Sequence, residues 1–131
     1  MLWLQTLLLN NMQREIKFRM WSKDVNRYWY DPENVYGCLK LSKMPEYKGL
    51  YDDMVWQQYT GLEDKNGVEI YEGDIIFCEI HYGIKNRVGI VDYFASSFII
   101  DWRNQTDDLL DEVCPDFEVI GNIFEHRELL K

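Results

Sequence analysis

The sequence predicts an all-β, or mainly β, fold in which the C-terminal two-thirds form a small SH3-like β-barrel. The barrel is expected to pack with an N-terminal β-hairpin or sheet lobe, and little helix is expected. Three observations lead to this. Apolar and polar residues alternate from Glu15 onward, which is the period of a strand. Short apolar runs recur at near-regular spacing between Gly-, Asn- and Asp-containing turns. Aromatic residues, which favour strands, make up 15% of the chain.

Length and composition indicate one compact unit that needs no disulfide or metal to fold. The chain has 131 residues, of which 47% are hydrophobic and 28% charged. Its cysteines, Cys38, Cys78 and Cys114, are odd in number and follow no secretion signal, so we expect reduced thiols and a cytoplasmic location in a bacterial host. No apolar run reaches the roughly 20 residues that cross a bilayer, and no membrane partner is expected.

The N-terminal β lobe is predicted over about residues 12–54. Its first strand places alternating residues on two faces: Ile16, Phe18 and Met20 against Lys17, Arg19 and Trp21. A second strand is expected around Tyr28 to Tyr30 and ends at Pro32, because proline donates no ladder hydrogen bond. Val35 to Leu41 is a third candidate strand. The irregular stretch from Ser42 to Asp53 is expected to be a long loop that separates the two lobes.

The barrel-like lobe is predicted over about residues 55–125. A hairpin turn is expected at Asn66-Gly67, since both residues tolerate positive φ. A further turn is expected at Gly83 to Asn86. Helix is expected around Thr106 to Val113 and in a short tail from His126 to Lys131. The predicted strands are Val55–Leu62, Val68–Tyr71, Ile75–Ile80, Arg87–Phe94, Phe98–Trp102 and Phe117–Phe124.

The first eleven residues differ in character from the rest. They are apolar but lack a basic start and a cleavage site, so they do not form a signal peptide. Strand-like alternation begins abruptly after Met12. We therefore interpret residues 1–11 as a non-native leader from an upstream start, with Met12 as the natural one. The alternative is that Trp3 to Leu9 forms a short amphipathic helix that packs on the body.

Three segments together resemble one family. The stretch from Gln58 to Ile76 reads QYTGLEDKNGVEIYEGDII, and it resembles the signature of the YopX family of small proteins encoded by phages and prophages. Arg14 to Trp21 resembles the family's opening strand, and Glu118 to Glu125 its closing strand. The resemblance spans residues 12–130. It implies an all-β fold, a bacterial or phage setting and assembly into a homo-oligomer, but it supplies no catalytic residues.

A structural explanation accounts for most of the signature. Its glycines fall at turns or close backbone approaches, and its aspartates can accept backbone N–H bonds in turns. Leu62, Ile70 and Ile75 are expected in the core. The alternative is that the signature forms a binding site. The residues singled out are Gly61, Asp64, Gly67, Tyr71, Gly73, Asp74 and Gly121.

No catalytic constellation is recognisable, and we predict a protein that is not an enzyme and has no cofactor. Cys78 and His81 have a ligand-like spacing, but residues three apart on a strand point to opposite faces, so no metal site is expected. Ser96-Ser97 lacks the Gly-x-Ser-x-Gly elbow of a nucleophile. Adjacent acids such as Asp52-Asp53 are typical of solvated loops.

Charge and aromatic content point to protein partners. The net charge is −9, and residues 107–118 carry six acids and no base, which opposes binding to a phosphate backbone. We expect self-association or a host or phage protein partner, through the aromatic side chains of Trp21, Tyr28, Trp29, Trp56 and Tyr59. The alternative is single-stranded nucleic acid, with these rings as stacking platforms and a cationic stripe of Arg14, Lys17, Arg19, Lys23 and Arg27.

Overall fold

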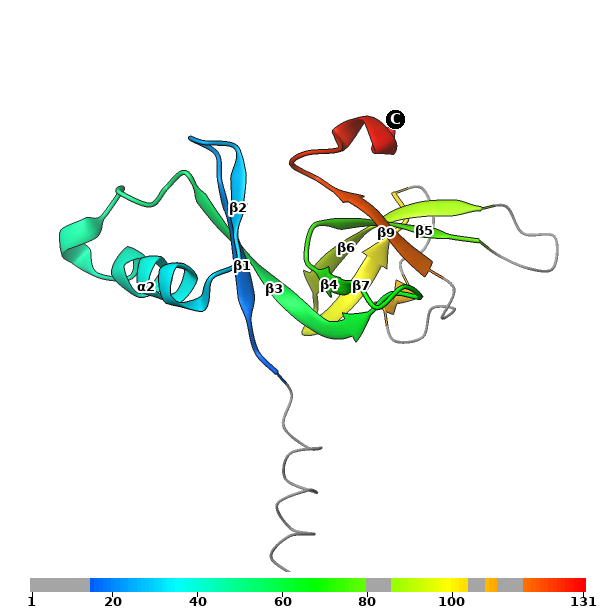
Figure 1. The fold of residues 1–131 in the computed structure, drawn as a ribbon, viewed down its shortest axis with the longest axis horizontal. Helices are drawn as coiled ribbons and strands as arrows, with labels where there is room; N and C mark the ends of the chain where they lie inside the picture. The colour runs from blue at the N-terminus through cyan, green and yellow to red at the C-terminus, as the bar shows by residue number, and fades with distance from the viewer. Residues whose placement is uncertain (1–14, 80–85, 104–107, 111–116) are drawn as a thin grey trace, which may run out of the picture.

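The computed structural model describes residues 15–79, 86–103, 108–110 and 117–131. Within these ranges the chain is mainly β, with two antiparallel sheets and one α-helix (Figure 1). The first sheet has the order β2-β1-β3-β4, and the second has the order β8-β7-β6-β5-β9. The first sheet comprises β1 (Phe18–Ser22), β2 (Arg27–Trp29), β3 (Met54–Glu63) and β4 (Glu69–Tyr71). The second comprises β5 (Asp74–Cys78), β6 (Arg87–Phe94), β7 (Ser97–Asp101), β8 (Asp108–Leu109) and β9 (Phe117–Asn122).

The long strand β3 connects the two halves of the molecule. Its first half pairs with β1, from Met54 opposite Ser22 to Gln58 opposite Phe18. Its second half pairs with β4 and contains an irregularity between Tyr59 and Glu63. The strand therefore runs from the N-terminal sheet to the region over the second sheet, as Figure 1 shows.

The mainly β class is confirmed, but the closed SH3-like barrel is not shown. The C-terminal strands form an open sheet with β8 and β9 at its edges, while β3 pairs with β1 and with β4 in the other sheet. A barrel requires the edge strands to pair with each other, and in the part of the chain that is described they do not. The strands predicted for the C-terminal lobe hold closely, and β6 has the bounds expected for it.

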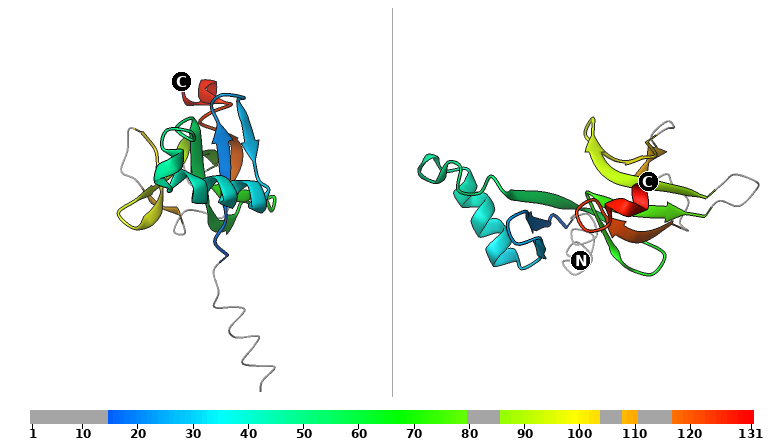
Figure 2. Two further views of the ribbon diagram at one scale, coloured as in Figure 1. Left: turned by 90° about the vertical axis from the view of Figure 1, so that its left-hand side faces the viewer. Right: turned by 90° about the horizontal axis from the view of Figure 1, so that it is seen from above.

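The expected strand from Val35 to Leu41 is wrong, because these residues belong to helix α2 (Pro32–Ser42). Pro32 occupies the first turn of this helix, where a missing N–H costs nothing, so it begins a helix as well as ending a strand. Val35 is fully buried, and Cys38 and Leu39 are half-buried on the same helix face. The helix packs against β1, and Figure 2 shows it at one end of the molecule.

The helix expected around Thr106 to Val113 is wrong at Asp108 and Leu109, whereas Leu110 has 3₁₀ geometry. Asp108 and Leu109 form strand β8, which pairs with Ile100 and Ile99 of β7. Residues 104–107 and 111–116 lie outside the described residues, as does most of the turn expected from Gly83 to Asn86. The C-terminal tail does contain the expected short helix, a 3₁₀ turn from Arg127 to Leu130. A second 3₁₀ turn, Pro45–Tyr47, interrupts the long loop after α2.

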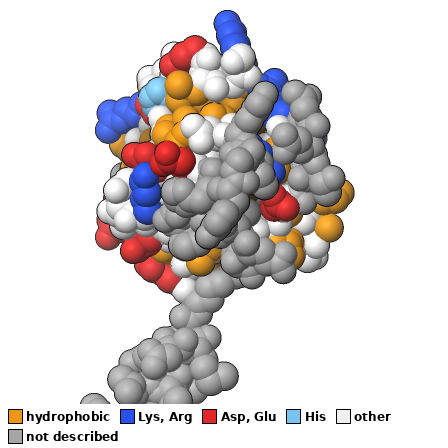
Figure 3. All heavy atoms as spheres, turned by 90° about the vertical axis from the view of Figure 1, so that its right-hand side faces the viewer, with side chains coloured by type: hydrophobic (Ala, Val, Ile, Leu, Met, Phe, Trp, Pro, Cys, Tyr) orange, Lys and Arg blue, Asp and Glu red, His pale blue; other side chains and the backbone are white. Residues whose placement is uncertain are grey.

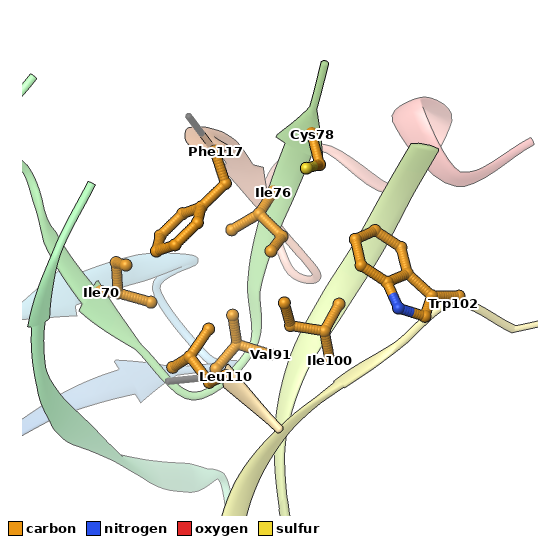
Figure 4. Close-up of a cluster of buried hydrophobic side chains, with 8 residues drawn as sticks. All are labelled: Ile70, Ile76, Cys78, Val91, Ile100, Trp102, Leu110 and Phe117. Atoms are coloured by element: carbon orange, nitrogen blue, oxygen red, sulfur yellow. The ribbon is translucent and has the colours of Figure 1, made fainter. Parts of the chain in front are cut away.

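The main core lies between the second sheet and strand β4. It is built from side chains of β4, β5, β6, β7 and β9 and of the residues that follow β7 and β8, which converge in Figure 4: Ile70, Ile76, Cys78, Val91, Ile100, Trp102, Leu110 and Phe117. Complete burial of an aliphatic side chain stabilises the folded state by about 1.5–3 kcal/mol. No helix among the described residues is long and apolar enough to span a membrane.

Gly89 on β6 is a test of how tightly this core is packed. A Cβ at this position would lie 2.5 Å from Ile100 Cγ2 and 2.8 Å from Trp102 Cε3. We predict that Gly89→Ala lowers the free energy of unfolding by about 1–3 kcal/mol through overpacking, measured by urea denaturation. Gly37→Ala is the matched control, because its Cβ would meet nothing within 4 Å and alanine favours helix. Equal effects of the two substitutions would contradict the packing described here.

Candidate functional site

A buried ion pair between Arg19 and Asp74 joins the two sheets, and we call this pair and the residues around it the junction. Arg19 on β1 donates from Nη2 to Oδ1 of Asp74, the first residue of β5, at 2.7 Å. Both side chains are about 95% or more buried. Although burial acts to lower it, Asp74 helps to raise the pKa of the Arg19 guanidinium. Burial raises the pKa of the Asp74 carboxyl, against the opposing effects of Arg19 and of the Tyr71 amide.

A further hydrogen bond and two aromatic rings hold the Arg19 guanidinium in place. Its Nε donates to Oε1 of Gln57 at 2.9 Å, and the same oxygen accepts a bond from the Tyr28 hydroxyl. The guanidinium lies 4.3 Å from the centre of the Tyr28 ring and 4.9 Å from that of Tyr71. Arg19 is thus enclosed by hydrogen-bond acceptors and aromatic faces, which compensates the cost of burying its charge.

The signature turn from Glu72 to Asp74 supplies the other side of this junction. Gly73 adopts φ +79°, and a Cβ there would lie 2.1 Å from Nε2 of Gln57, so only glycine fits. Its N–H donates to the carbonyl of Val91, and its carbonyl accepts from the N–H of Ile123. One residue therefore connects the turn to β6 and to the segment after β9.

Asp64 fixes the second signature turn. Its Oδ1 accepts the N–H groups of Asn66 and Val68, which closes the β3–β4 hairpin. Its Oδ2 accepts the N–H of Val119 on β9 at 2.9 Å. Although burial acts to raise it, these three N–H groups lower the pKa of Asp64 below its ordinary value. Gly67 in this turn has φ +79°, as a hairpin glycine requires.

The closing segment completes the junction from the C-terminal side. Asn122 accepts the N–H groups of Phe124 and Glu125, which turns the chain after β9. Gly121 allows the close approach of His126, whose side chain would lie 2.8 Å from a Cβ. The turn stacks Phe124 on Trp21 of β1, with ring centroids 5.0 Å apart and planes at 1°.

A cleft of about 400 Å³ lies over this junction. Its lining includes Arg19, Asp74, Tyr30, Tyr71 and Glu69. Its charges are already paired within the protein, because Glu69 accepts a 2.6 Å bond from Lys17. Burial raises the pKa of the Tyr71 phenol, so this hydroxyl stays protonated at neutral pH. The cleft thus offers aromatic faces and hydrogen bonds rather than net charge.

The residues predicted from sequence separate into two groups in the structure. Tyr71, Gly73, Asp74 and Gly121 meet at the junction, whereas Gly61, Asp64 and Gly67 shape the β3–β4 hairpin. Of the predicted partner surface, Trp21 and Tyr59 are buried, with 4% and 7% exposure, because they face the junction. Tyr28, Trp29 and Trp56 are half-buried, and Trp56 donates from its ring nitrogen to the carbonyl of Val35.

The cationic stripe is interrupted, because Arg19 is a buried structural residue. Sequence reasoning missed this role, although an arginine within the apolar strand FRMW is a signal for a buried partner of opposite charge.

Among the residues described, no group of three or more His, Cys, Asp or Glu could hold a metal, and His81 and Cys114 lie outside them. On the face shown in Figure 3, acidic and basic side chains are interspersed among the described atoms.

Sequence reasoning also missed an exposed aromatic hairpin. Strands β6 and β7 are joined by Ala95 and Ser96, which adopt φ +50° and +66°. Positive φ is unfavourable for residues with a side chain, and such strain is often found at functional sites. The residues before this turn, Tyr93 and Phe94, are 50% and 68% exposed. The sequence carried a signal for this hairpin, because a run of apolar residues stands at a turn that contains no glycine.

The geometry defines a small mainly β protein whose two sheets are locked by three segments far apart in the sequence. Comparison with known proteins agrees with this. The family model described as YopX protein matches residues 17–131, and the chain therefore belongs to the YopX family. The crystal structure of protein EF1440 from Enterococcus faecalis is similar over 91% of this chain and 100% of that one, with a TM-score of 0.58 and 22% identity. That likeness concerns the fold alone. Curated proteins gave no match.

The buried ion pair gives a direct test of the junction. We predict that Arg19→Met lowers the free energy of unfolding by about 3–5 kcal/mol, because it leaves the Asp74 charge buried without its partner. Adding Asp74→Asn removes that charge, so the double variant loses less than the sum of the two single variants. Lys17→Met is the control and costs at most about 1 kcal/mol, since its pair with Glu69 is partly exposed. Additive losses in denaturant unfolding would contradict the pairing.

The lowered pKa of Asp64 gives a pH-dependent test. The folded state favours the ionised carboxylate, so its stabilisation is complete above the unfolded pKa of about 4 and is lost as pH falls through the lower folded pKa. In the Asp64→Asn variant the side chain does not titrate. The N–H of Val119 then faces either the NH₂ group of the amide or no acceptor. We predict a loss of about 1–3 kcal/mol at neutral pH that shrinks below pH of about 4. Asp24→Asn, in the exposed β1–β2 turn, is the control, and a pH-independent deficit of Asp64→Asn would contradict the assignment.

Proposed function

We propose that this protein acts by binding proteins, including further copies of itself, and catalyses no reaction. The observation that carries the proposal is the exposed pair Tyr93 and Phe94 on a strained hairpin. Aromatic side chains are enriched at the centres of protein interfaces, because a rigid ring buries a large area at low entropic cost. The two-residue turn itself requires positive φ at both positions, so the exposure of the two rings is the feature that is consistent with selection for a contact.

The buried acidic and basic groups of the junction and of the β3–β4 hairpin are used for structure. Arg19, Asp64 and Asp74 are buried and bonded within the junction or its neighbouring hairpin. The half-buried carboxylate of Glu72 accepts the N–H of Gln58 at 2.7 Å. These contacts support a binding protein. By resemblance to its family, the setting we propose is the cytoplasm of a bacterium that carries a phage or prophage, where the protein serves an accessory role.

Single-stranded nucleic acid is the second candidate partner. One observation favours it: on the edge strand β2, the Arg27 guanidinium lies 4.0 Å from the ring of Trp29, a pairing that can stack a base. The burial of Arg19 and the pairing of Lys17 with Glu69 reduce the cationic surface that would accompany it. A partner of this class would give salt-sensitive binding.

Two measurements test the proposal. We predict that the scattering mass of the full chain exceeds the monomer mass of 15.8 kDa and rises with concentration. We also predict that proteins captured by the tagged chain from its bacterial host remain bound after nuclease treatment. A monomer at every concentration would remove self-association. A set of captured molecules lost on nuclease treatment would replace the protein partner with nucleic acid.

A further inference from the structure

Strand β2 is an edge of the first sheet, with β1 on one side and no described strand on the other (Figure 1). The backbone bonds of β1 show which groups of β2 point outward. The N–H of Tyr59 donates to the carbonyl of Lys17, and the N–H of Lys23 donates to the carbonyl of Asp53. In an antiparallel strand, successive residues direct their backbone groups to opposite sides. The odd-numbered residues of β1 therefore bond to β3, and the even-numbered residues bond to β2.

The same alternation identifies the unpaired groups of β2. Arg27 and Trp29 lie opposite even-numbered residues of β1, so their backbone groups bond inward. Tyr28 lies between them, and its N–H and carbonyl point away from the sheet. Continuation of the strand past Trp29 places the groups of Tyr30 on the same side. Unpaired groups of this kind are a template for a further strand.

The sequence along this edge is complementary to itself. Residues 27–31, which we call the β2 edge, read Arg-Tyr-Trp-Tyr-Asp. Antiparallel pairing of two copies about Trp29 places Arg27 of each copy opposite Asp31 of the other. It also places Tyr28 opposite Tyr30, and Trp29 opposite its own counterpart. Opposite charges and aromatic pairs directly across two strands both stabilise a sheet, and this register supplies both.

The register also matches the direction of the backbone groups. Tyr28 of one copy and Tyr30 of the other both present their groups outward, so they can exchange two N–H···O=C bonds. Twofold symmetry repeats this exchange on the other side of Trp29. The two Trp29 residues then occupy the non-hydrogen-bonded position, where opposite side chains approach most closely. Both copies use the same surface, so the contact closes as a dimer.

The charged side chains of the β2 edge are available for this contact. Arg27 and Asp31 are exposed, and Tyr30 is 55% exposed. The Arg27 guanidinium lies 4.0 Å from the centre of its own Trp29 ring, on the face where Asp31 of the second copy would lie. Asp31 uses one oxygen to accept a 2.9 Å bond from Asn34, and no described residue bonds the other oxygen.

The neighbouring charges do not oppose the pairing. Lys23 and Asp24 in the β1–β2 turn are of opposite sign, and Glu33 is in the first turn of α2. All three lie outside the β2 edge, because α2 begins at Pro32 and the chain leaves the sheet there. The charge complementarity of the contact therefore depends on Arg27 and Asp31.

We propose that the β2 edge of one molecule pairs with the β2 edge of a second copy, which joins their first sheets into one continuous sheet. This rests on the proposed self-association and specifies its surface. The exposed rings of Tyr93 and Phe94 lie in the second sheet and stay accessible to a different protein.

Charge reversal in the full-length chain tests the register. Arg27→Glu places two acids opposite each other at both ends of the contact, and Asp31→Lys places two bases there. Like charges directly opposite destabilise a strand pair, so sedimentation of each variant alone is expected to show dimerisation weakened about tenfold or more. An equimolar mixture is expected to dimerise as the wild type does, since the acid introduced in one copy faces the base introduced in the other.

Two control variants change the net charge by the same amounts at another place. Lys48→Glu and Glu46→Lys are at exposed positions in the segment after α2, and both should dimerise as the wild type does. The substituted residues of all four variants are exposed, so the fold is retained, which circular dichroism verifies.

The outcomes separate this contact from self-association in general. Wild-type protein that self-associates while neither Arg27→Glu nor Asp31→Lys changes its mass would overturn the β2 edge and leave the proposed self-association intact. Wild-type protein that is monomeric at every concentration would overturn both. Variants that dissociate but are not restored by mixing would overturn the antiparallel register.

Hydrogen exchange followed by NMR provides a measurement that needs no substitution. In the proposed dimer the amides of Tyr28 and Tyr30 donate across the contact, whereas the amide of Trp29 donates to β1 in monomer and dimer alike. The first two amides are therefore expected to become protected as the protein concentration rises, while the protection of Trp29 stays constant. A dimer in which the Tyr28 amide exchanges as fast as in the monomer would overturn the pairing.

Discussion

The fold depends on the ion pair between Arg19 and Asp74, since it is a fully buried charged contact between the two sheets. Placing a charged pair in a buried site is costly, and removal of one partner costs more than the pair gains. Once Arg19 occupies the first sheet, the second sheet must present a carboxylate at one position. The buried pair thus favours one placement of the sheets over others that would bury the same apolar area.

The other parts of the junction follow from this constraint. Gln57 orients the guanidinium, and Gly73 leaves room for the Gln57 side chain, so the signature glycine and aspartate act as a unit with residues outside the signature. Phe124 then covers Trp21 from the C-terminal side. Three segments that identify the family in the sequence therefore converge at one place. Their shared role is to join the sheets, which explains a recognisable signature without catalytic chemistry.

Structure and binding are assigned to different regions of the molecule. The signature residues are buried or engaged in turns, while the exposed aromatic rings lie at the β6–β7 hairpin, outside the signature. A protein of this kind can keep its fold while the exposed hairpin varies. The positive φ at Ala95 and Ser96 is tolerated because β7 is paired with β6 along its full length, up to the turn itself, and Val91 and Ile100 of these strands lie in the core.

The sequence by itself determined the mainly β class, most strand positions and the hairpin at Asn66-Gly67, because period-two alternation and turn chemistry are local properties. It did not determine helix α2, since Pro32 is equally compatible with the end of a strand and the first turn of a helix. Only the tertiary structure decided that the second sheet stays open, that Arg19 is buried and that Phe94 is exposed. Each of these depends on which distant residue lies opposite, such as Asp74 for Arg19, and local periodicity carries no information about that pairing.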